Sequence, residues 1–574
     1  MSVRLRLGSS NAALDAAFDP LVARVLAHRG ISDPGQVDYQ LKKLLSYHQL
    51  KGINEAVVLL VNALEAHQHI VIVGDFDCDG ATSTSLAMLA LGAMGAKNIS
   101  YLVPNRFDFG YGLSTALVDY AKASEPNLIV TVDNGIASHE GVIRAHELGI
   151  KVLVTDHHLA AETLPEADAI VNPNQPGCEF PFKSTAGVGV IFYVMSALRR
   201  QLQTQGWFDQ QGITPPNMAQ YLDLVALGTV ADLVPMEHNN RILVAQGVAR
   251  IRAGKARTGL LALLSIAKRQ HHNLQASDLG FSVGPRLNAA GRLDDMSLGI
   301  ECLLSDNEQI AAQLAQELDE LNAQRRNIEA DMQEQAGNIL ARLEASQDEV
   351  MPKCVCLYHP DWHQGVVGIV ASRIKEKWHR PALVFAKGDE DTLKGSCRSI
   401  SGFHLRDALA AVDAKNPGLI IKFGGHAMAA GLSIKADNLG AFEEALNAYA
   451  DKHLPDSLLA QEWRSDGELG AHELQLNQAF LLQQAGPWGQ GFEEPTFHGR
   501  FMLVQQRVVG EKHLKLVLAH PQTGELVDGI YFNMDLAIWP NTCEQADLVY
   551  RLDINEFRGR QSVQLMVQQM TAVL

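Results

Sequence analysis

Short apolar runs alternate with stretches of helical periodicity from residue 54 to about residue 235 of this chain. The apolar runs are HIVIVGD, ISYLVP, LIVTVD and KVLVTD, and the intervening stretches include SLAMLALGAMGA and VIRAHELG. Such alternation is typical of βαβ units, which assemble a parallel sheet. Ligands of these sheets lie at the carboxyl ends of the strands, where loops converge and helix amino-termini point inward. The segment therefore predicts an α/β domain with its functional site at one edge of the sheet.

Carboxylate and imidazole side chains stand at the ends of these runs and of a later helical stretch. They are Asp75, Asp77, Asp79, Asp133, Asp156, His157, His158 and, in LGTVADLVP, Asp232. Buried acidic and imidazole groups are energetically costly unless a metal or a substrate uses them. Their placement at the ends of successive strands and of a helix predicts one shared site.

The ligand types indicate which metal this site would hold. Aspartate oxygens with one or two imidazoles suit manganese or magnesium better than a closed structural zinc site, which favours thiolates. Asp75, Asp77 and Asp79 share one face if the chain is extended there, and Asp133 from the neighbouring run can bridge two ions. Two metals about 4 Å apart activate a water and neutralise charge on the oxygens of a phosphoryl displacement. We expect two Mn²⁺ or Mg²⁺ ions.

Each of these groups also has an ordinary structural explanation. A DxDxDG stretch can be a solvated turn, and Asp133 can cap a helix because Asn134-Gly135 follows. Asp232 can simply end the helix predicted over LDLVALGTVA, and His157 and His158 can be polar loop residues. Together these explanations need four coincidences at successive element ends, so the functional interpretation is favoured.

Composition limits the class of protein. A chain of 574 residues is several times the usual domain length of about 150 residues. A net charge of −17 argues against a surface that coats nucleic acid generally, yet residues 351–426 carry 11 Lys and Arg against 7 Asp and Glu, which allows a local anion groove. The seven cysteines lack the spacing of zinc or disulfide frameworks, and no segment is a continuous membrane span. We expect a cytoplasmic protein without a membrane partner.

The rest of the chain predicts further modules. The stretch EQIAAQLAQELDELNAQRRNIEADMQEQAGNILARLEAS favours one long helix between two lobes over a coiled coil, because its apolar positions are not strict heptads. Short strand-like runs near the C-terminus predict a five-stranded oligonucleotide-binding barrel. The predicted modules are an N-terminal segment (1–50), the α/β catalytic domain (51–240), a helical region ending in the long helix (241–350), a second α/β substrate-binding domain (351–455) and the barrel (460–574).

The motifs GDFDCDG, TVDNG, TDHH and GTVADLVP resemble the four motifs of the DHH phosphoesterase superfamily. The stretches PNRFDFGYGL, GVGVIFY, GPRLNAAGRLDD, WHQGVVGIVASR, GSCRS and KFGGHAMAAG are similar to its RecJ branch of single-strand-specific 5′ to 3′ DNA exonucleases. Gly74-Asp75 favours this branch, because some DHH relatives carry a His ahead of their Asp pair. The resemblance extends from about residue 50 to the C-terminus. It implies a parallel-sheet DHH domain, a DHH-associated domain and the terminal barrel.

The resemblance also implies roles for the acidic and imidazole groups. It implies that Asp133 bridges the ions and that Asp156 and His158 face the phosphate or orient the ligands. The division of the first three acids between the two metals stays open. The implied metal ligands are Asp75, Asp77, Asp79, Asp133, His157 and Asp232, and the implied catalytic groups are Asp133, Asp156 and His158.

Substrate contacts are expected mainly on the second lobe. In GSCRS, Ser396 and Arg398 can present a hydroxyl and a guanidinium to a phosphate, and a tight turn with a surface arginine is the alternative, which stays open for Ser396 alone. His426 follows two glycines that permit close backbone approach. The thiols of Cys78 and Cys397, which stand where relatives often have smaller residues, are expected to point away from the metals.

A single-strand channel is expected to combine charge with stacking surfaces. Arg106 and Tyr111 fit that description, although Tyr111 could equally be a core aromatic. Arg286 and Arg292 either line the same passage or form ion pairs with Asp294 and Asp295.

These observations predict a metal-dependent exonuclease that hydrolyses single-stranded DNA from the 5′ end to nucleoside 5′-monophosphates, in DNA repair and recombination. The alternatives are a DHH phosphodiesterase for short oligonucleotides or cyclic dinucleotides and a non-catalytic single-strand-binding protein. The resemblance implies a single-strand-binding protein and a helicase as partners, and a monomer is favoured. The stretch AGPWGQGFEEPTF, which contains Trp488 and Phe492, is predicted to be a junction that orients the barrel.

Overall fold

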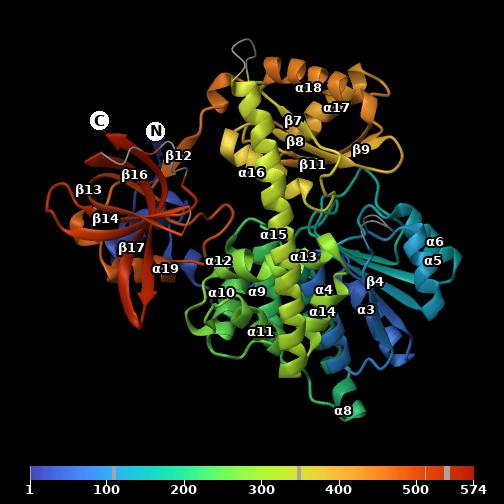
Figure 1. Cartoon of the computed structure of the whole chain (residues 1–574). Helices are drawn as coiled ribbons and strands as arrows, with labels where there is room; N and C mark the ends of the chain where they lie inside the picture. Colours follow the sequence, from blue (N-terminus) through green and yellow to red (C-terminus); the bar gives the residue numbers. More distant parts are fainter. Residues whose placement is uncertain are drawn as a thin grey trace. The chain divides into compact units, whose positions relative to one another are not determined.

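The computed structural model describes residues 2–105, 112–345, 351–510, 512–534, 539 and 543–573, with only the backbone for 342–345. The chain packs as two compact units (Figure 1). The first contains Val3–Asp319 together with Trp463–Leu574, and the second contains Glu320–Glu462. The module boundaries predicted from the sequence stay a prediction. Among the described residues, no helix is both long and apolar enough to cross a membrane.

A five-stranded, all-parallel sheet forms the centre of the first unit, as the alternation of apolar runs predicts. The strand order is β3-β2-β4-β5-β6. The strands are β2 (Ile70–Val73), β3 (Ile99–Leu102), β4 (Leu128–Val132), β5 (Lys151–Thr155) and β6 (Ala169–Val171). Every residue of β2 and β4 is buried, because helices pack on the sheet and leave little of the two strands in water.

Helices pack on this sheet, and alternate side chains along each strand point to opposite faces. Val71, Ile129 and Val152 belong to a core cluster with residues of α5 and α6. The helices α4 and α7 contact the same strands, and the side chains that point the other way meet them. The helices around the sheet are α3 (Ile53–Glu65), α4 (Cys78–Ala93), α5 (Thr115–Ala121), α6 (His139–Glu147), α7 (Gly187–Thr204), α8 (Trp207–Gln211) and α9 (Leu222–Ala231).

The order of the strands creates a topological switch point. The chain leaves β2 to form β3 on one side and then returns to form β4 on the other side of β2. Because successive crossovers leave in opposite directions, a crevice opens at the carboxyl ends of β2 and β4. Asp75 and Asp77 follow β2, and Asp133 follows β4, so the topology brings these acids to that crevice.

A helical region follows α9 and ends in a single helix of 38 residues, α15 (Glu308–Ala345), which confirms the predicted long helix. One turn of this region is a π-helix, η7 (Leu279–Val283). The other helices of the region are α10 (His238–Arg252), α11 (Thr258–Ile266), α12 (Ala276–Asp278), α13 (Gly284–Leu293) and α14 (Ser297–Leu304).

The second unit is the predicted second α/β domain and contains a mixed sheet of order β10-β11-β9-β8-β7. Only β7 and β8 pair in parallel. The strands are β7 (Val355–Tyr358), β8 (Ala382–Lys387), β9 (Thr392–Arg398), β10 (Lys422–Gly425) and β11 (Ala429–Lys435), and the helices are α16 (Val367–Trp378), α17 (Leu405–Lys415) and α18 (Leu439–His453). Phe385 of β8 packs edge-on against Phe442 of α18 in its core.

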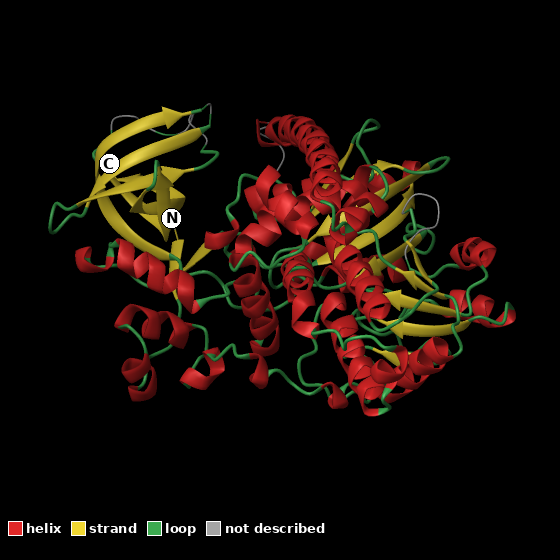
Figure 2. Cartoon of the chain, turned by 90° about the horizontal axis from the view of Figure 1, so that it is seen from below, coloured by secondary structure: helices red, strands yellow, loops and turns green. Residues whose placement is uncertain are grey.

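The C-terminal strands close into a five-stranded barrel, which confirms the predicted barrel architecture (Figures 1 and 2). The parallel pairing of β15 with β17 completes the ring. The strands are β13 (Phe497–Val509), β14 (His513–Ala519), β15 (Leu526–Tyr531), β16 (Gln545–Phe557) and β17 (Arg560–Val573). The helix α19 (Leu476–Ala485) precedes them and contacts β16 and β17.

The N-terminal segment packs against the barrel end of the chain, a contact that the sequence pattern did not predict. This segment contains β1 (Ser2–Leu5), α1 (Ala12–Ala17) and α2 (Pro20–His28). Arg29, whose side chain is 1% exposed, donates to both oxygens of Asp466 at 2.6 and 2.9 Å. Both termini therefore lie beside the barrel (Figure 2).

The stretch with Trp488 and Phe492 connects the barrel to the segment after α9. The two rings stack at 4.9 Å, and the guanidinium of Arg241 in α10 lies 4.2 Å from the centre of the Phe492 ring. Met236 donates its backbone N–H to the Gln490 carbonyl at 2.7 Å. These contacts are those of a junction, and an orienting role for it stays a prediction.

Candidate metal centre

The turn from β2 into α4 presents the acids of GDFDCDG. Asp75 accepts a hydrogen bond from the Phe76 N–H, and Asp77 caps α4 by accepting from the Gly80 N–H at 3.0 Å. The chain becomes helical at Cys78, so the three acids do not share one extended face as the i, i+2, i+4 spacing would give; Asp79 is presented from the first turn of the helix. A Cβ at Gly80 would lie 2.4 Å from the Asp75 carbonyl oxygen, so this tight turn requires glycine.

Asp79 lies against the amino-terminus of α7. Its two carboxylate oxygens accept hydrogen bonds from the Gly187 N–H at 2.7 Å and the Val188 N–H at 3.0 Å. The partial positive charge of a helix amino-terminus stabilises such a carboxylate. The side chain is buried, at 1% exposure, and its position is therefore determined by α7 as well as by α4.

Two glycines leave the space that these acids occupy. A Cβ at Gly187 would lie 2.7 Å from Asp133 Oδ1, and a Cβ at Gly228 in α9 would lie 2.7 Å from Asp79 Oδ1. Sequence reasoning did not identify either glycine as part of the site. The only signal was their presence inside GVGVIFY and LGTVADLVP, motifs that had been noted for other reasons.

Asp133 occupies a strained backbone position directly after β4. Its φ of 62° lies in the left-handed region, which costs a non-glycine residue about 1–3 kcal/mol. The buried Asn134 side chain donates to the carbonyls of Val73 (3.1 Å) and Val132 (2.9 Å), which ties this turn to β2 and β4. The helix-cap explanation for Asp133 is wrong, because the residue at the amino-terminus of α6 is Ser138.

Asp156 organises the two histidines that follow it. Its carboxylate accepts hydrogen bonds from the backbone N–H groups of Ile136, His157 and His158, and it contacts His158 Nδ1 at 2.8 Å. The Asn172 side chain donates to the His158 carbonyl at 2.9 Å. Asp156 is 1% exposed and contacts the His158 ring and the His157 backbone, while an orienting or catalytic role for it stays a prediction.

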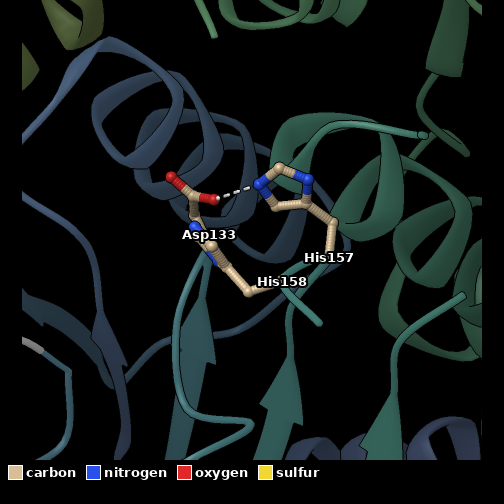
Figure 3. A group of neighbouring side chains, drawn as sticks. All are labelled: Asp133, His157 and His158. Carbon is tan, nitrogen blue, oxygen red and sulfur yellow. Dashed lines mark ion pairs between the residues drawn. The ribbon is translucent and has the colours of Figure 1, made fainter. Parts of the chain in front are cut away.

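The His157 ring faces Asp133 (Figure 3) and also lies close to two other predicted metal ligands, Asp232 and Asp79. Its Nε2 lies 3.1 Å from Asp133 Oδ1, 3.5 Å from Asp232 Oδ2 and 4.0 Å from Asp79 Oδ2. Among the described residues, neither His157 Nε2 nor Asp232 Oδ2 has a hydrogen-bond partner, although both atoms are buried. Buried polar atoms normally have hydrogen-bond partners. A cation bound here would be the missing partner of both atoms, so their arrangement fits a metal site.

Every metal ligand implied by the resemblance lies in this cluster. Three groups of side chains each offer ligand atoms within 4.8 Å of one another, and two of the groups share Asp133 while two share His157. They are Asp133 with His157 and His158, Asp79 with His157 and Asp232, and Asp75 with Asp77 and Asp133. The arrangement suits more than one ion with Asp133 between them.

The electrostatics of the cluster also fit a cation. Burial and then the neighbouring carboxylates raise the pKa of Asp79 to about 7, and the same causes raise the pKa values of Asp133 and Asp232 well above their usual range. Burial lowers the pKa of His157 to about 4, so its ring is neutral at pH 7 and can offer a lone pair. Several buried carboxylates repel one another, and a divalent cation removes that repulsion.

His158 has the opposite electrostatic character. Burial alone would lower the pKa of His158, but the hydrogen bond to Asp156 and the nearby carboxylates outweigh burial and raise it to about 9. The Asp156 pKa is lowered despite burial, chiefly by the His158 hydrogen bond. The two residues therefore form an ion pair beside the cluster.

Helix α13 supports the β2–α4 turn. Asn288 accepts a hydrogen bond from the Cys78 N–H at 2.7 Å, and a Cβ at Gly291 would lie 1.8 Å from the Phe76 carbonyl oxygen. Sequence reasoning noted GPRLNAAGRLDD for its arginines and for the family resemblance, and missed both contacts. Cys78 itself is 1% exposed, and burial raises its pKa, so it stays a thiol.

The ion pair of Arg286 in α13 differs from the predicted one. Arg286 donates to the Ser282 carbonyl and pairs with Asp319 at 2.7 Å, so the predicted alternative partners Asp294 and Asp295 are wrong for this residue. Its side chain is 13% exposed. Arg292 is half-buried on the same helix. Substrate contact by either arginine stays a prediction.

The other predicted substrate residues lie in the second unit or outside the described residues. Ser396 and Arg398 lie on β9, which corrects the tight-turn interpretation of GSCRS. Arg398 Nη1 donates to Ser396 Oγ at 3.3 Å, and Cys397 between them is buried in the core. His426 directly follows β10. Arg106 and Tyr111 lie outside the described residues.

Comparisons with known proteins agree with this architecture. Residues 69–229 match the DHH family, N-terminal domain, residues 351–452 match the DHHA1 domain and residues 465–569 match the RecJ OB domain. The chain is 54% identical over 566 residues to the single-stranded-DNA-specific exonuclease RecJ of Salmonella typhimurium, with 98% of both chains covered.

Two solved structures are also similar. The crystal structure of Thermus thermophilus RecJ in complex with Mn²⁺ has a TM-score of 0.79 at 29% identity, over 100% of this chain and 80% of that chain. The structure of the same protein in complex with Mg²⁺ has a TM-score of 0.73 at 28% identity, over 100% and 79%. Sequence identity over almost the full length, together with the three domain matches, shows that this chain belongs to the RecJ family of single-stranded-DNA-specific exonucleases.

Proposed function

We propose that this chain is a metal-dependent exonuclease that degrades single-stranded DNA from the 5′ end to nucleoside 5′-monophosphates. The observation that carries the proposal is the convergence of Asp79, Asp133, His157 and Asp232, which come from four separate segments, on one buried cluster. A closed barrel of the RecJ OB type in the same chain supports a single-stranded nucleic acid as the substrate.

The residues of the cluster would hold two Mn²⁺ or Mg²⁺ ions. When bound, such a pair supplies an activated water and charge neutralisation for phosphodiester hydrolysis. Asp133, which belongs to two of the three ligand groups, is the candidate bridging ligand. Asp156 is the candidate group that orients the His158 ring through Nδ1 and the turn through the His157 and His158 backbone N–H groups, and His158 is the candidate donor to a phosphate oxygen. Ser396 and Arg398 are the candidate groups that receive a second phosphate.

The family membership supports a wider setting for this activity. We place the chain in DNA repair and recombination in the cytoplasm, acting as a monomer on strands that a helicase opens and a single-strand-binding protein covers. The resemblance of the motifs supports these partners, and no particular residue is assigned to them.

A labelled-strand assay tests the proposal directly. Oligonucleotides labelled at the 5′ or the 3′ end are incubated with Mn²⁺, Mg²⁺ or a chelator. We expect immediate release of labelled mononucleotide from the 5′-labelled strand only, and no release with the chelator. Cleavage restricted to dinucleotides would instead indicate a short-oligonucleotide phosphodiesterase, and DNA retention without any release would indicate a binding protein.

Asp133→Asn tests the bridging role. This change keeps the shape of the side chain and removes its charge, so we expect turnover to fall by about a thousandfold or more and Mn²⁺ binding to weaken. Asp119→Asn is the matched control, because Asp119 is an aspartate whose side chain is 53% exposed on α5. Near-normal turnover of a folded Asp133→Asn protein would contradict the bridging role.

A further inference from the structure

Two large apolar side chains remain in water directly beside the metal centre. Leu233 follows the candidate ligand Asp232 and is 66% exposed, and Phe281 of η7 is 81% exposed. An isolated exposed apolar residue is ordinary, but η7, which carries Phe281, contacts α9, the helix that Asp232 and Leu233 directly follow. We call the pair the apolar step.

Close backbone packing brings the two segments together. A Cβ at Gly280 would lie 3.1 Å from Val230 Cγ1, and a Cβ at Gly284 would lie 3.1 Å from Ala231 Cβ. Val230 and Ala231 form the last turn of α9, which ends at Asp232. The π-helix that carries Phe281 therefore packs on the turn that carries the metal ligand.

The backbone on both sides of the step is unusual. Leu233 has a φ of 59°, a left-handed conformation that is rare and unfavourable for a leucine. Phe281 lies in a π-helical turn, and such turns occur frequently at functional sites. Both departures present an apolar side chain to solvent, where it gains nothing from the hydrophobic effect in the free protein.

Arg286 holds the π-helical turn in place. Its guanidinium donates to the Ser282 carbonyl within η7 and pairs with Asp319 at 2.7 Å. Nη1 and Nη2 of the guanidinium make these two contacts, and the Arg286 side chain is 13% exposed. The arginine that the sequence suggested as a substrate contact is thus placed to position Phe281.

We propose that Leu233 and Phe281 receive a nucleobase of the single strand whose phosphate lies at the metal centre. The inference rests on the proposed function and adds a base-binding surface to it. The step is continuous with the metal centre through the peptide bond that joins Asp232 to Leu233, and a nucleobase is the apolar part of the substrate closest to its phosphates. Stacking on an aromatic ring tolerates every base, which suits an enzyme that removes nucleotides without regard to sequence.

Abasic substrates combined with variants test this surface. Oligonucleotides carry one abasic nucleotide at the first, second, third or fourth position from the 5′ end. For the wild-type protein we expect kcat/KM to fall about tenfold at one of these positions. Phe281→Ala should lower kcat/KM on intact DNA by a similar factor. In this variant the abasic nucleotide at that position should cause no further fall in kcat/KM. Phe281→Trp should behave like the wild type on both substrates. Leu233→Ala should act in the same direction.

Controls separate this contact from structural effects. Tyr120→Ala removes another exposed ring, which is 60% exposed on α5, and should leave kcat/KM unchanged on both intact and abasic strands. The Mn²⁺ affinity of Phe281→Ala should equal that of the wild type. Undiminished digestion by Phe281→Ala, or an abasic effect that persists in it, would overturn the inference while leaving the exonuclease intact. Light scattering compares the oligomeric states of Phe281→Ala and the wild type. A difference between them would also overturn the inference and would assign the apolar step to a contact between copies of the chain. If the wild-type protein fails to digest intact strands, the proposed function itself fails.

Discussion

Gly187 is a residue at which a single methyl group should disturb the metal centre. The added Cβ of Gly187→Ala would lie 2.7 Å from both Cβ and Oδ1 of Asp133, so the aspartate must move. We expect Mn²⁺ affinity to fall 10- to 100-fold, in the range seen when groups that support metal ligands are altered, and turnover to fall with it. Isothermal titration with Mn²⁺ measures the affinity.

Gly440→Ala is the matched control for this change. Gly440 also lies in the first turn of a helix, α18, but nothing lies within 4 Å of its added Cβ. The control should retain Mn²⁺ affinity and gain slightly in helix stability. Equal Mn²⁺ affinity in Gly187→Ala and the wild type would contradict the proposed crowding at Asp133.

At the scale of the elements, α13 supports the metal-binding turn through Asn288. Asn288→Ala leaves the Cys78 N–H without its acceptor, and an unsatisfied buried donor costs about 1–3 kcal/mol. Because the turn carries Asp77 and Asp79, we expect a loss of stability together with a weaker Mn²⁺ affinity. Asn447→Ala removes a similar bond, from the Cys354 N–H at 2.9 Å in the second unit, and should lower stability alone. Matching Mn²⁺ affinities in the two variants would contradict a supporting role for α13.

The elements also show what the sequence could predict and why. The parallel sheet was predictable because its central strands β2 and β4 are buried on both faces, which produces continuous apolar runs. The acids of the site were predictable because they directly follow those strands. The residues that hold these acids in place were not predictable, because Asn288 lies 210 residues from Cys78 and Gly187 lies 108 residues from Asp79. Local patterns report the conformation of a segment, whereas such contacts exist only after distant helices have packed.

At the scale of the whole molecule, one buried ion-pair network ties the N-terminal segment to the barrel end of the chain. Asp466, with a fully buried side chain, pairs with Arg29 and also contacts His28 Nδ1 at 3.0 Å. Burial alone would raise the pKa of Asp466, but the hydrogen bonds and charge of Arg29 outweigh burial and lower it. A carboxyl whose pKa is lower in the folded state stabilises the fold at every pH above its unfolded value of about 4 and loses that contribution as the pH falls through the folded value.

Asp466→Asn should therefore destabilise the first unit in a pH-dependent way. At pH 7 the variant leaves the Arg29 charge buried without its carboxylate, which costs about 3–5 kcal/mol and lowers the melting temperature. Below about pH 4 the unfolded wild-type chain binds a proton at this carboxyl that the folded protein does not yet bind, so the difference in stability between the two proteins should shrink as the pH falls toward the lower folded pKa. Asp547→Asn, which breaks the exposed pair between Arg500 and Asp547, should leave stability almost unchanged at either pH. Calorimetric scans of the three proteins at pH 7 and pH 3.5 measure these differences in stability. If the stability difference between the wild type and Asp466→Asn does not narrow in acid, the network acts through packing and not through charge.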